Sequence, residues 1–326
     1  MASFGLKLMS ELRGPRELID QAIEAERRGF DFVAISDHFH PWLPEHEHSS
    51  FAWSVLGAIA DRTRSIGITT GITCPIGRYE PAIVAQAAAT IATIAGHGRF
   101  TLALGAGERL NEHVTGKPFP SVRVRHEMLA EAVTAIRELW GGRFTSFHGR
   151  YVTVDDARVY DLPSEPIPIV IGVSGDASLD VASRCEADGI MATEPRTSLV
   201  DGWVRRGGNR ARTWTEVPFA WAPSDEEGLH LAWERMRFAV PGWKVMAELP
   251  NPVNFAAATD AIPPLAVGEV VPYGPDPARY VDAVRAFLDA GFEHIAILPV
   301  SDEIDETLRF WEDAVQPELR RVLEPA

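Results

Sequence analysis

The chain has 326 residues, 46% of them hydrophobic, and carries 31 Lys and Arg against 46 Asp and Glu, a formal net charge of −15. A chain of this length buries enough apolar surface to fold without disulfides or metals, and its acidic balance disfavours nucleic acid and anionic membranes as partners. The amino terminus lacks the apolar run of a secretory signal, no stretch is long enough to span a bilayer, and Cys74 and Cys185 form no CxxC pair. These features predict a reduced cytoplasmic protein.

Short apolar runs alternate with longer amphipathic stretches along the whole chain. Residues 4–9 precede a helical pattern over 15–29, and residues 30–36 have the composition of a buried strand. Further strands are expected at 65–72, 100–107, 167–173, 188–193, 215–223 and 294–300, and further helices at 51–63, 81–94, 124–140, 176–187 and 198–206.

Strands that are separated by helices imply parallel βαβ units. About eight strands indicate a single (β/α)₈ barrel domain over 1–326, with insertions at about 143–165, which has the pattern of a hairpin, and at about 224–275. The alternative is an open doubly wound sheet. The glycine-rich turn "LGAGERLNE" (104–112) argues against that alternative because it lacks the third glycine of a dinucleotide fingerprint.

A barrel brings the residues at the carboxyl ends of its strands to one mouth. Polar or small residues follow five of the expected strands at this point: Glu11, then Asp37 and His38, then Thr70 to Cys74, then Glu108 and Asn111, then Ser174 and Gly175. The sequence therefore predicts a functional site at this mouth.

The histidines of the loop that begins "SDHFHPW" (36–42) allow two interpretations. His38 and His40 are two residues apart, and His46 and His48 repeat that spacing, which is compatible with metal ligation. No clear third ligand is visible elsewhere, so a loop without metal is favoured, with His46 and His48 in solvent.

Other features at the mouth also have a structural alternative. Asp37 is either a helix cap or a site residue, and Glu108 either forms a structural salt bridge or faces a ligand. Trp42 lies between prolines in a polar loop, where an aromatic ring more often covers a flat ligand than packs in a core. The turn at 172–178 either caps a helix or binds phosphate through its amides.

Four segments, taken together, resemble one family. "SDHFHPW" (36–42), "TTGITCPIGRYEP" (69–81), "LALGAGERLNE" (102–112) and "VSGDASLDVASRCEADG" (173–189) are similar to the matching segments of the luciferase-like superfamily, in the branch related to the glucose-6-phosphate dehydrogenases that use coenzyme F420. The resemblance implies a (β/α)₈ barrel and a deazaflavin cofactor with a phosphate-bearing tail, coenzyme F420.

The resemblance also implies catalytic roles. Asp37 contacts the deazaflavin ring, and His38 accepts the proton of a substrate hydroxyl beside the reactive carbon. Trp42 borders the substrate, Glu108 stands near the ring nitrogen that gains a proton, and Glu11 belongs to the same pocket.

Cofactor contacts follow from the same resemblance. Gly107 and Asn111 match positions that contact the cofactor, and Cys74 lies near the ring. A non-proline cis peptide is expected between Gly71 and Ile72, against the back of the ring. The tail phosphate is expected on the turn formed by Val173, Ser174, Gly175 and Asp176.

An alcohol releases hydride only if a base removes its hydroxyl proton, and imidazole suits that task near neutral pH. His38 is the expected base and Glu108 the expected proton donor. Only Arg196 matches the three basic side chains that hold the phosphate in sugar-phosphate members, so glucose 6-phosphate is disfavoured. Trp243 and Phe255 are expected to line a pocket for a neutral alcohol or ketone, with ordinary core packing as the alternative.

Two other functions compete with an F420-dependent oxidoreductase. The wider superfamily includes FMN-dependent monooxygenases, which makes FMN the second candidate cofactor. A protein that binds deazaflavin without catalysis is an alternative of another class, which the presence of both His38 and Glu108 disfavours. A small-molecule substrate is expected as partner, and the resemblance implies a homodimer.

Overall fold

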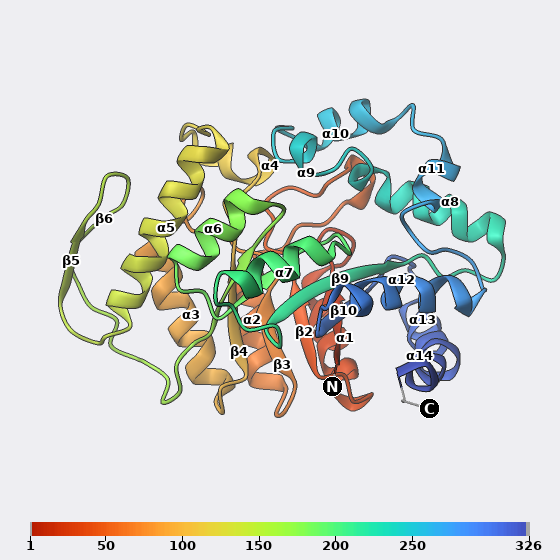
Figure 1. Ribbon diagram of the computed structural model, residues 1–326, viewed down its shortest axis with the longest axis horizontal. Helices are drawn as coiled ribbons and strands as arrows, with labels where there is room; N and C mark the ends of the chain where they lie inside the picture. Colours follow the sequence, from red (N-terminus) through yellow and green to blue (C-terminus); the bar gives the residue numbers. More distant parts are fainter. Residues whose placement is uncertain (1, 324–326) are drawn as a thin grey trace.

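Eight parallel strands close into a barrel in the computed structural model, which describes residues 2–323. Their order around the barrel is β1-β10-β9-β8-β7-β4-β3-β2 (Figure 1). The predicted (β/α)₈ fold is therefore confirmed. The strands are β1 (Ser3–Leu8), β2 (Phe32–Ile35), β3 (Gly67–Thr70), β4 (Phe100–Leu104), β7 (Ile169–Gly172), β8 (Gly189–Met191), β9 (Thr213–Phe219) and β10 (His294–Pro299).

Amphipathic helices surround the barrel because each turns an apolar stripe toward the outer faces of the strands. Proline at the first turn and a glycine or basic residue at the end delimit several of them, as in the helix that begins at Pro15. The surrounding helices are α1 (Pro15–Arg27), α2 (Ala52–Arg62), α3 (Pro81–Ala95), α5 (Val122–Leu139), α6 (Asp176–Arg184), α7 (Thr197–Arg205), α12 (Pro277–Ala290), α13 (Ile304–Phe310), the π-helical η4 (Trp311–Val315) and α14 (Gln316–Leu323).

The strands alternate between two apolar environments. Their outward side chains join the large core under the helices, while their inward side chains fill the barrel lumen. Phe32 and Trp214 meet edge to face within the lumen, with ring centroids 4.9 Å apart. The lumen is therefore packed and not a pore.

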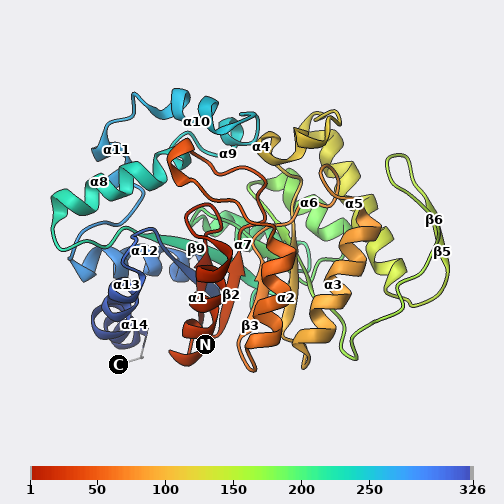
Figure 2. The ribbon, with the colours of Figure 1, turned by 180° about the vertical axis from the view of Figure 1, so that it is seen from behind.

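Two segments leave the alternation where insertions were expected. The hairpin of β5 (Thr145–His148) and β6 (Thr153–Ala157) projects from the side of the barrel (Figure 1). Helices α8 to α11 lie over the carboxyl ends of the strands, at the top of Figure 2. They are α8 (Asp225–Met236), η3 (Arg237–Ala239), α9 (Trp243–Met246), α10 (Pro252–Thr259) and α11 (Pro264–Gly268).

The parallel register fixes which residues reach the mouth. Leu8 pairs with Ile35 and Ile35 with Thr70, so the residues that follow these strands emerge side by side. Short helices, η1 (Pro44–His46), α4 (Arg109–Glu112) and η2 (His113–Thr115), occupy the loops there. No helix within residues 2–323 is long and apolar enough to cross a membrane.

Candidate active site

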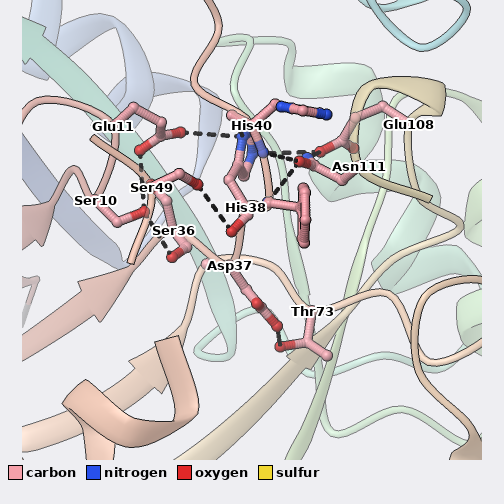
Figure 3. Close-up of polar contacts among 12 residues, drawn as sticks. Ser10, Glu11, Ser36, Asp37, His38, His40, Ser49, Thr73, Glu108 and Asn111 are labelled. Carbon is pink, nitrogen blue, oxygen red and sulfur yellow. Dashed lines mark hydrogen bonds and ion pairs between the residues drawn. The ribbon is translucent and has the colours of Figure 1, made fainter. Parts of the chain in front are cut away.

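The imidazole of His38 lies between two carboxylates (Figure 3). Its Nδ1 is 3.2 Å from Glu11 Oε1, and its Nε2 is 3.3 Å from Glu108 Oε1. Glu11 follows β1, His38 follows β2 and Glu108 follows β4, so three strand ends contribute one residue each. The structure thus brings together the imidazole and the two carboxylates to which the sequence pointed.

The environment of the ring assigns its tautomer. Nδ1 faces two acceptors, Glu11 Oε1 and the carbonyl oxygen of His40 at 3.3 Å, so we place a proton on Nδ1. Nε2 is then the ring nitrogen with the free lone pair, and it lies 3.3 Å from Glu108 Oε1. Glu108 therefore stands on the side of the ring away from Glu11.

The loop that carries His38 is fastened at several points. Ser49 Oγ donates to the carbonyl of His38 at 3.0 Å, and the amide of His48 donates to the carbonyl of Glu11 at 3.2 Å. Glu45 pairs with the buried Arg237 of η3. The base is thus held by its own loop and by the insertion that covers it.

Asn111 orients both members of the pair. Its Oδ1 accepts from the amides of Phe39 and His40 at 2.7 and 3.1 Å, and its Nδ2 donates to Glu108 Oε1 at 2.8 Å. The side chain is buried. These contacts give Asn111 a positioning role; its predicted contact with the cofactor stays a prediction.

Asp37 points away from this cluster (Figure 3). Its carboxylate accepts from Thr73 Oγ1 at 2.6 Å and from Arg78 Nη2 and Tyr79 Oη at 2.9 Å each. Burial and the neighbouring Asp37 raise the pKa of Tyr79 well above its usual value, which keeps the phenol a donor. The carboxylate is thus occupied by protein donors, and contact of Asp37 with the ring stays a prediction.

The end of β3 continues into the expected non-proline cis peptide between Gly71 and Ile72. The carbonyl of Gly71 accepts from Lys7 Nζ at 2.6 Å, and Lys7 also pairs with Glu216 Oε2 at 2.6 Å. Lys7 is buried inside the barrel, where a charge needs close partners. The lysine therefore links the end of β3 to β9 across the lumen.

Position 107 requires a glycine because of its backbone conformation and its close neighbours. Its φ of +75° lies in the left-handed region, and a Cβ at this position would come within 2.6 Å of Cys74 Sγ and 2.8 Å of Glu112 Cγ. Cys74 is buried, and burial raises the pKa of its thiol well above the usual value. Cofactor contact by Gly107 and Cys74 stays a prediction.

Glu112 is a buried acid that the sequence interpretation missed. Its Oε2 accepts from the amide of Arg78 at 2.6 Å, which ties α4 to the turn after β3. Burial, with smaller contributions from the charges of Glu108 and Asp37, raises the pKa of Glu112 to about 7. The pattern "GERLNE" holds this residue one position after Asn111, and nothing in that spacing marked it as buried.

We expect Glu112→Gln to change how stability depends on pH. Glu112 has a pKa raised from 4.5 to about 7 in the folded chain, so the folded state binds more protons than the unfolded state over this interval. Wild-type stability therefore falls as pH rises through that interval, by on the order of 3 kcal/mol from this group. Glutamine still accepts from Arg78 and carries no charge. Denaturant unfolding at pH 5 and pH 8 should show less loss in the variant, and equal losses would contradict the assignment.

The turn before α6 supplies hydrogen-bond acceptors for some of its own backbone amides. The amides of Ser174 and Gly175 donate to Ser178 Oγ at 2.9 and 3.1 Å, while a Cβ at Gly175 would meet nothing within 4 Å. Arg196 donates to the carbonyl of Ser174 and pairs with Glu194 Oε2 at 2.7 Å. The open side of this turn, from Val173 to Asp176, thus lies beside Arg196.

Aromatic rings cover His38 from the side of the insertion. Trp42 meets His38 edge to face, with ring centroids 4.6 Å apart, and stacks on Phe238 at 4.8 Å. Trp243 and Phe255 meet the edge or face of Trp42 at 6.3 and 5.2 Å. Phe255 is 0% exposed, so it supports Trp42 from behind, whereas Trp243 is partly buried.

The expectation that His46 lies in solvent is wrong. His46 is 2% exposed, packs its ring edge against Phe238, and has no hydrogen-bond partner on either ring nitrogen. Burial lowers the pKa of His46 to about 4. The ring is therefore neutral near pH 7 and packs beneath the loop as an apolar side chain would. No group of three or more His, Cys, Asp or Glu side chains within the described part of the chain could hold a metal ion.

Comparisons with known proteins decide the family. The family model described as luciferase-like monooxygenase matches residues 2–294. The chain belongs to this family. The resemblance inferred from the four motifs is therefore confirmed.

Relatives within the family share nearly the whole chain. An F420-dependent glucose-6-phosphate dehydrogenase of Microbacterium testaceum is 32% identical over 98% of this chain and 97% of its own length. An F420-dependent hydroxymycolic acid dehydrogenase of Mycobacterium tuberculosis is 36% identical over 97% of this chain and 88% of its own. Among solved structures, an F420-dependent secondary alcohol dehydrogenase in complex with an F420–acetone adduct superposes with a TM-score of 0.88 at 28% identity, covering 98% of this chain and 99% of that one.

Proposed function

We propose that the chain is an F420-dependent oxidoreductase that transfers a hydride between a neutral secondary alcohol, or its ketone, and the deazaflavin. The observation that carries the proposal is the His38 ring, held between Glu11 and Glu108 beneath a wall of aromatic rings. The relatives' named cofactor supports F420. The hydrophobic surroundings support a neutral substrate.

The residues present fit such a cofactor. Ile72 is only partly buried at the end of β3, and its side chain packs closely against Gly105 and Gly172, where a Cβ would lie 3.4 and 2.7 Å from it. The open turn at Gly175 leads into α6, whose amino terminus favours an anionic group, and Arg196 adds a cation beside it. We assign the ring to the platform at Ile72 and the tail phosphate to the turn.

In the proposed reaction the catalytic residues accept and donate protons. Oxidation of the alcohol breaks its O–H and C–H bonds: the proton leaves to His38 Nε2 and the carbon releases hydride. When bound, F420 would supply the acceptor for the hydride and for one proton. Glu11 stabilises the imidazolium that forms, through Nδ1. Glu108, whose Oε1 lies 3.3 Å from Nε2, is in its protonated form the proposed donor on the cofactor side. The proton gained by His38 balances the proton lost by Glu108, so the reaction needs no net proton from solvent.

Charge around the pocket argues against a phosphorylated substrate. Arg196, the one cation that matched a phosphate ligand, is already paired with Glu194 and with the carbonyl of Ser174. The segments 251–261 and 267–277 contain no lysine or arginine. A dianion would therefore lack the charge-assisted hydrogen bonds that hold phosphate. Glucose 6-phosphate is for this reason not the proposed substrate, although it is named for several relatives.

Titration of the purified protein with F420 and, separately, with FMN tests the cofactor. We expect saturable binding of F420 and hydride transfer to or from it with a simple secondary alcohol or ketone. Tight FMN binding with oxygen uptake in the presence of reduced flavin would instead establish a monooxygenase. Binding of F420 without reduction by any alcohol in a broad panel would establish a protein that only carries the cofactor.

We further propose a homodimer in the cytoplasm. Ile83 and Ile94 are 57% and 46% exposed and lie on one face of α3, which also exposes Gln86 and Thr90, and we expect a second copy to cover this face. Both cysteines are free, as expected in a reducing compartment. Light scattering should give the mass of two chains, and Ile83→Lys should shift it toward one. A monomer in the wild type would contradict the dimer.

A further inference from the structure

The short helix α9 bridges two strand ends over the mouth (Figure 2). At its carboxyl end, the carbonyl of Ala247 accepts from the amide of Arg109, directly after Glu108, at 2.9 Å. At its amino end, Trp243 Nε1 donates to Thr193 Oγ1 at 2.8 Å. Thr193 follows β8, whereas Arg109 follows β4. The insertion is thus fastened to the barrel on both sides of the site.

The two fastenings differ in kind. The contact to Arg109 joins two backbone groups and does not depend on side-chain identity. The contact to Thr193 is a single exposed hydrogen bond between two side chains, so it depends on the identity of both residues. It joins the amino end of α9 to the end of β8, while the buried Met246 anchors the same helix in the apolar cluster beneath the insertion.

Trp243 also stands next to the reacting groups. Its ring meets Trp42 at 6.3 Å with an interplanar angle of 67°, and Trp42 in turn meets His38 at 4.6 Å. A displacement of Trp243 would therefore enlarge the space beside Trp42 without removing any group that touches His38.

We propose that the hydrogen bond between Trp243 and Thr193 determines the size of the substrate. While it is formed, Trp243 closes the pocket around a short secondary alcohol. When it is absent, α9 pivots on Ala247 and admits longer chains. Thr193 is therefore a specificity-determining residue that acts through Trp243. The inference rests on the proposed function.

Four proteins test the latch formed by these two residues: the wild type, Thr193→Val, Trp243→Phe and Thr193→Ser. Valine keeps the shape of threonine without the acceptor, phenylalanine keeps an aromatic ring without the donor, and serine keeps the hydroxyl. The activity readout is kcat/KM for the series from propan-2-ol to octan-2-ol, followed by deazaflavin absorbance. The second readout, amide hydrogen exchange over residues 243–249, needs no cofactor. Thermal melting confirms that each variant is folded.

We expect the ratio of kcat/KM for octan-2-ol to that for propan-2-ol to rise roughly fivefold or more in Thr193→Val and Trp243→Phe, about the effect of one net hydrogen bond. Exchange over 243–249 should accelerate in the same two variants. Thr193→Ser should match the wild type in both readouts.

An active enzyme whose ratio is the same in all four proteins would overturn the latch and leave the proposed function intact. The same holds if exchange is unchanged in the two disrupting variants. A wild type that is inactive on every alkanol and alkanone would overturn the proposed function and, with it, this inference.

Discussion

Replacing His38 with alanine should lower kcat for alcohol oxidation by about 10³-fold and leave the affinity for deazaflavin nearly unchanged. In the proposed mechanism the ring removes the hydroxyl proton at Nε2 while Glu11, 3.2 Å from Nδ1, stabilises the charge that results. The variant keeps Glu108, 3.3 Å from where Nε2 lies in the wild type, but lacks the imidazole that accepts the proton in the proposed mechanism. Stopped-flow absorbance at saturating cofactor measures the loss.

His48→Ala is the matched control because His48 lies in the same loop, is exposed, and contributes only its backbone amide to the site. It should behave as the wild type. Added imidazole should restore part of the activity of His38→Ala, because the truncation leaves room for it. A rate for His38→Ala equal to that of the control would contradict the role of base.

Replacing Glu108 with glutamine should lower kcat by about 10²-fold and remove one limb of the pH–rate profile. Asn111 Nδ2 donates to Glu108 Oε1 at 2.8 Å, and a glutamine side-chain oxygen can accept the same hydrogen bond. The change is therefore confined to the proton and the charge. Because glutamine carries no acidic proton, the cofactor side of the site loses its proposed donor. The pH dependence of kcat between pH 5 and 9 is the measurement.

Asn111→Ala separates geometry from chemistry. It removes the side chain that holds Glu108 and the loop of His38 but keeps both titrating groups, so it should lower kcat and retain the shape of the pH profile. Were Glu108→Gln to alter neither the rate nor the profile, the assignment of Glu108 as proton donor would fail.

The barrel could be predicted because its signal is local. Each strand is a short apolar run and each crossover helix has its own amphipathic period, so the alternation of "FDFVAIS" with its neighbours already implies parallel strands. The position of the site at the barrel mouth could be predicted from the topology, because the parallel register brings the residue after Ile35 beside the residue after Leu8. Glu11, His38 and Glu108 were found by this rule.

Residues whose role depends on contacts distant in sequence could not be predicted. In the sequence, Lys7 is an ordinary polar residue within a strand. Only the closed barrel places Glu216 beside it. His46 and His48 have the same local sequence pattern. Only His46 is covered by Phe238, which belongs to the insertion much later in the chain. For Phe255 the sequence left two alternatives open, a pocket lining and core packing, and the structure buries it completely against Trp42.

Substrate class is the part of the account that a single measurement tests most directly. Purified protein is mixed with oxidised F420, and deazaflavin absorbance is followed after addition of a neutral secondary alcohol or of glucose 6-phosphate. We predict loss of absorbance with the alcohol, its recovery with the matching ketone, and no change with the sugar phosphate, whose charge Arg196 is not free to meet. Reduction by glucose 6-phosphate with no response to any neutral alcohol would contradict the account.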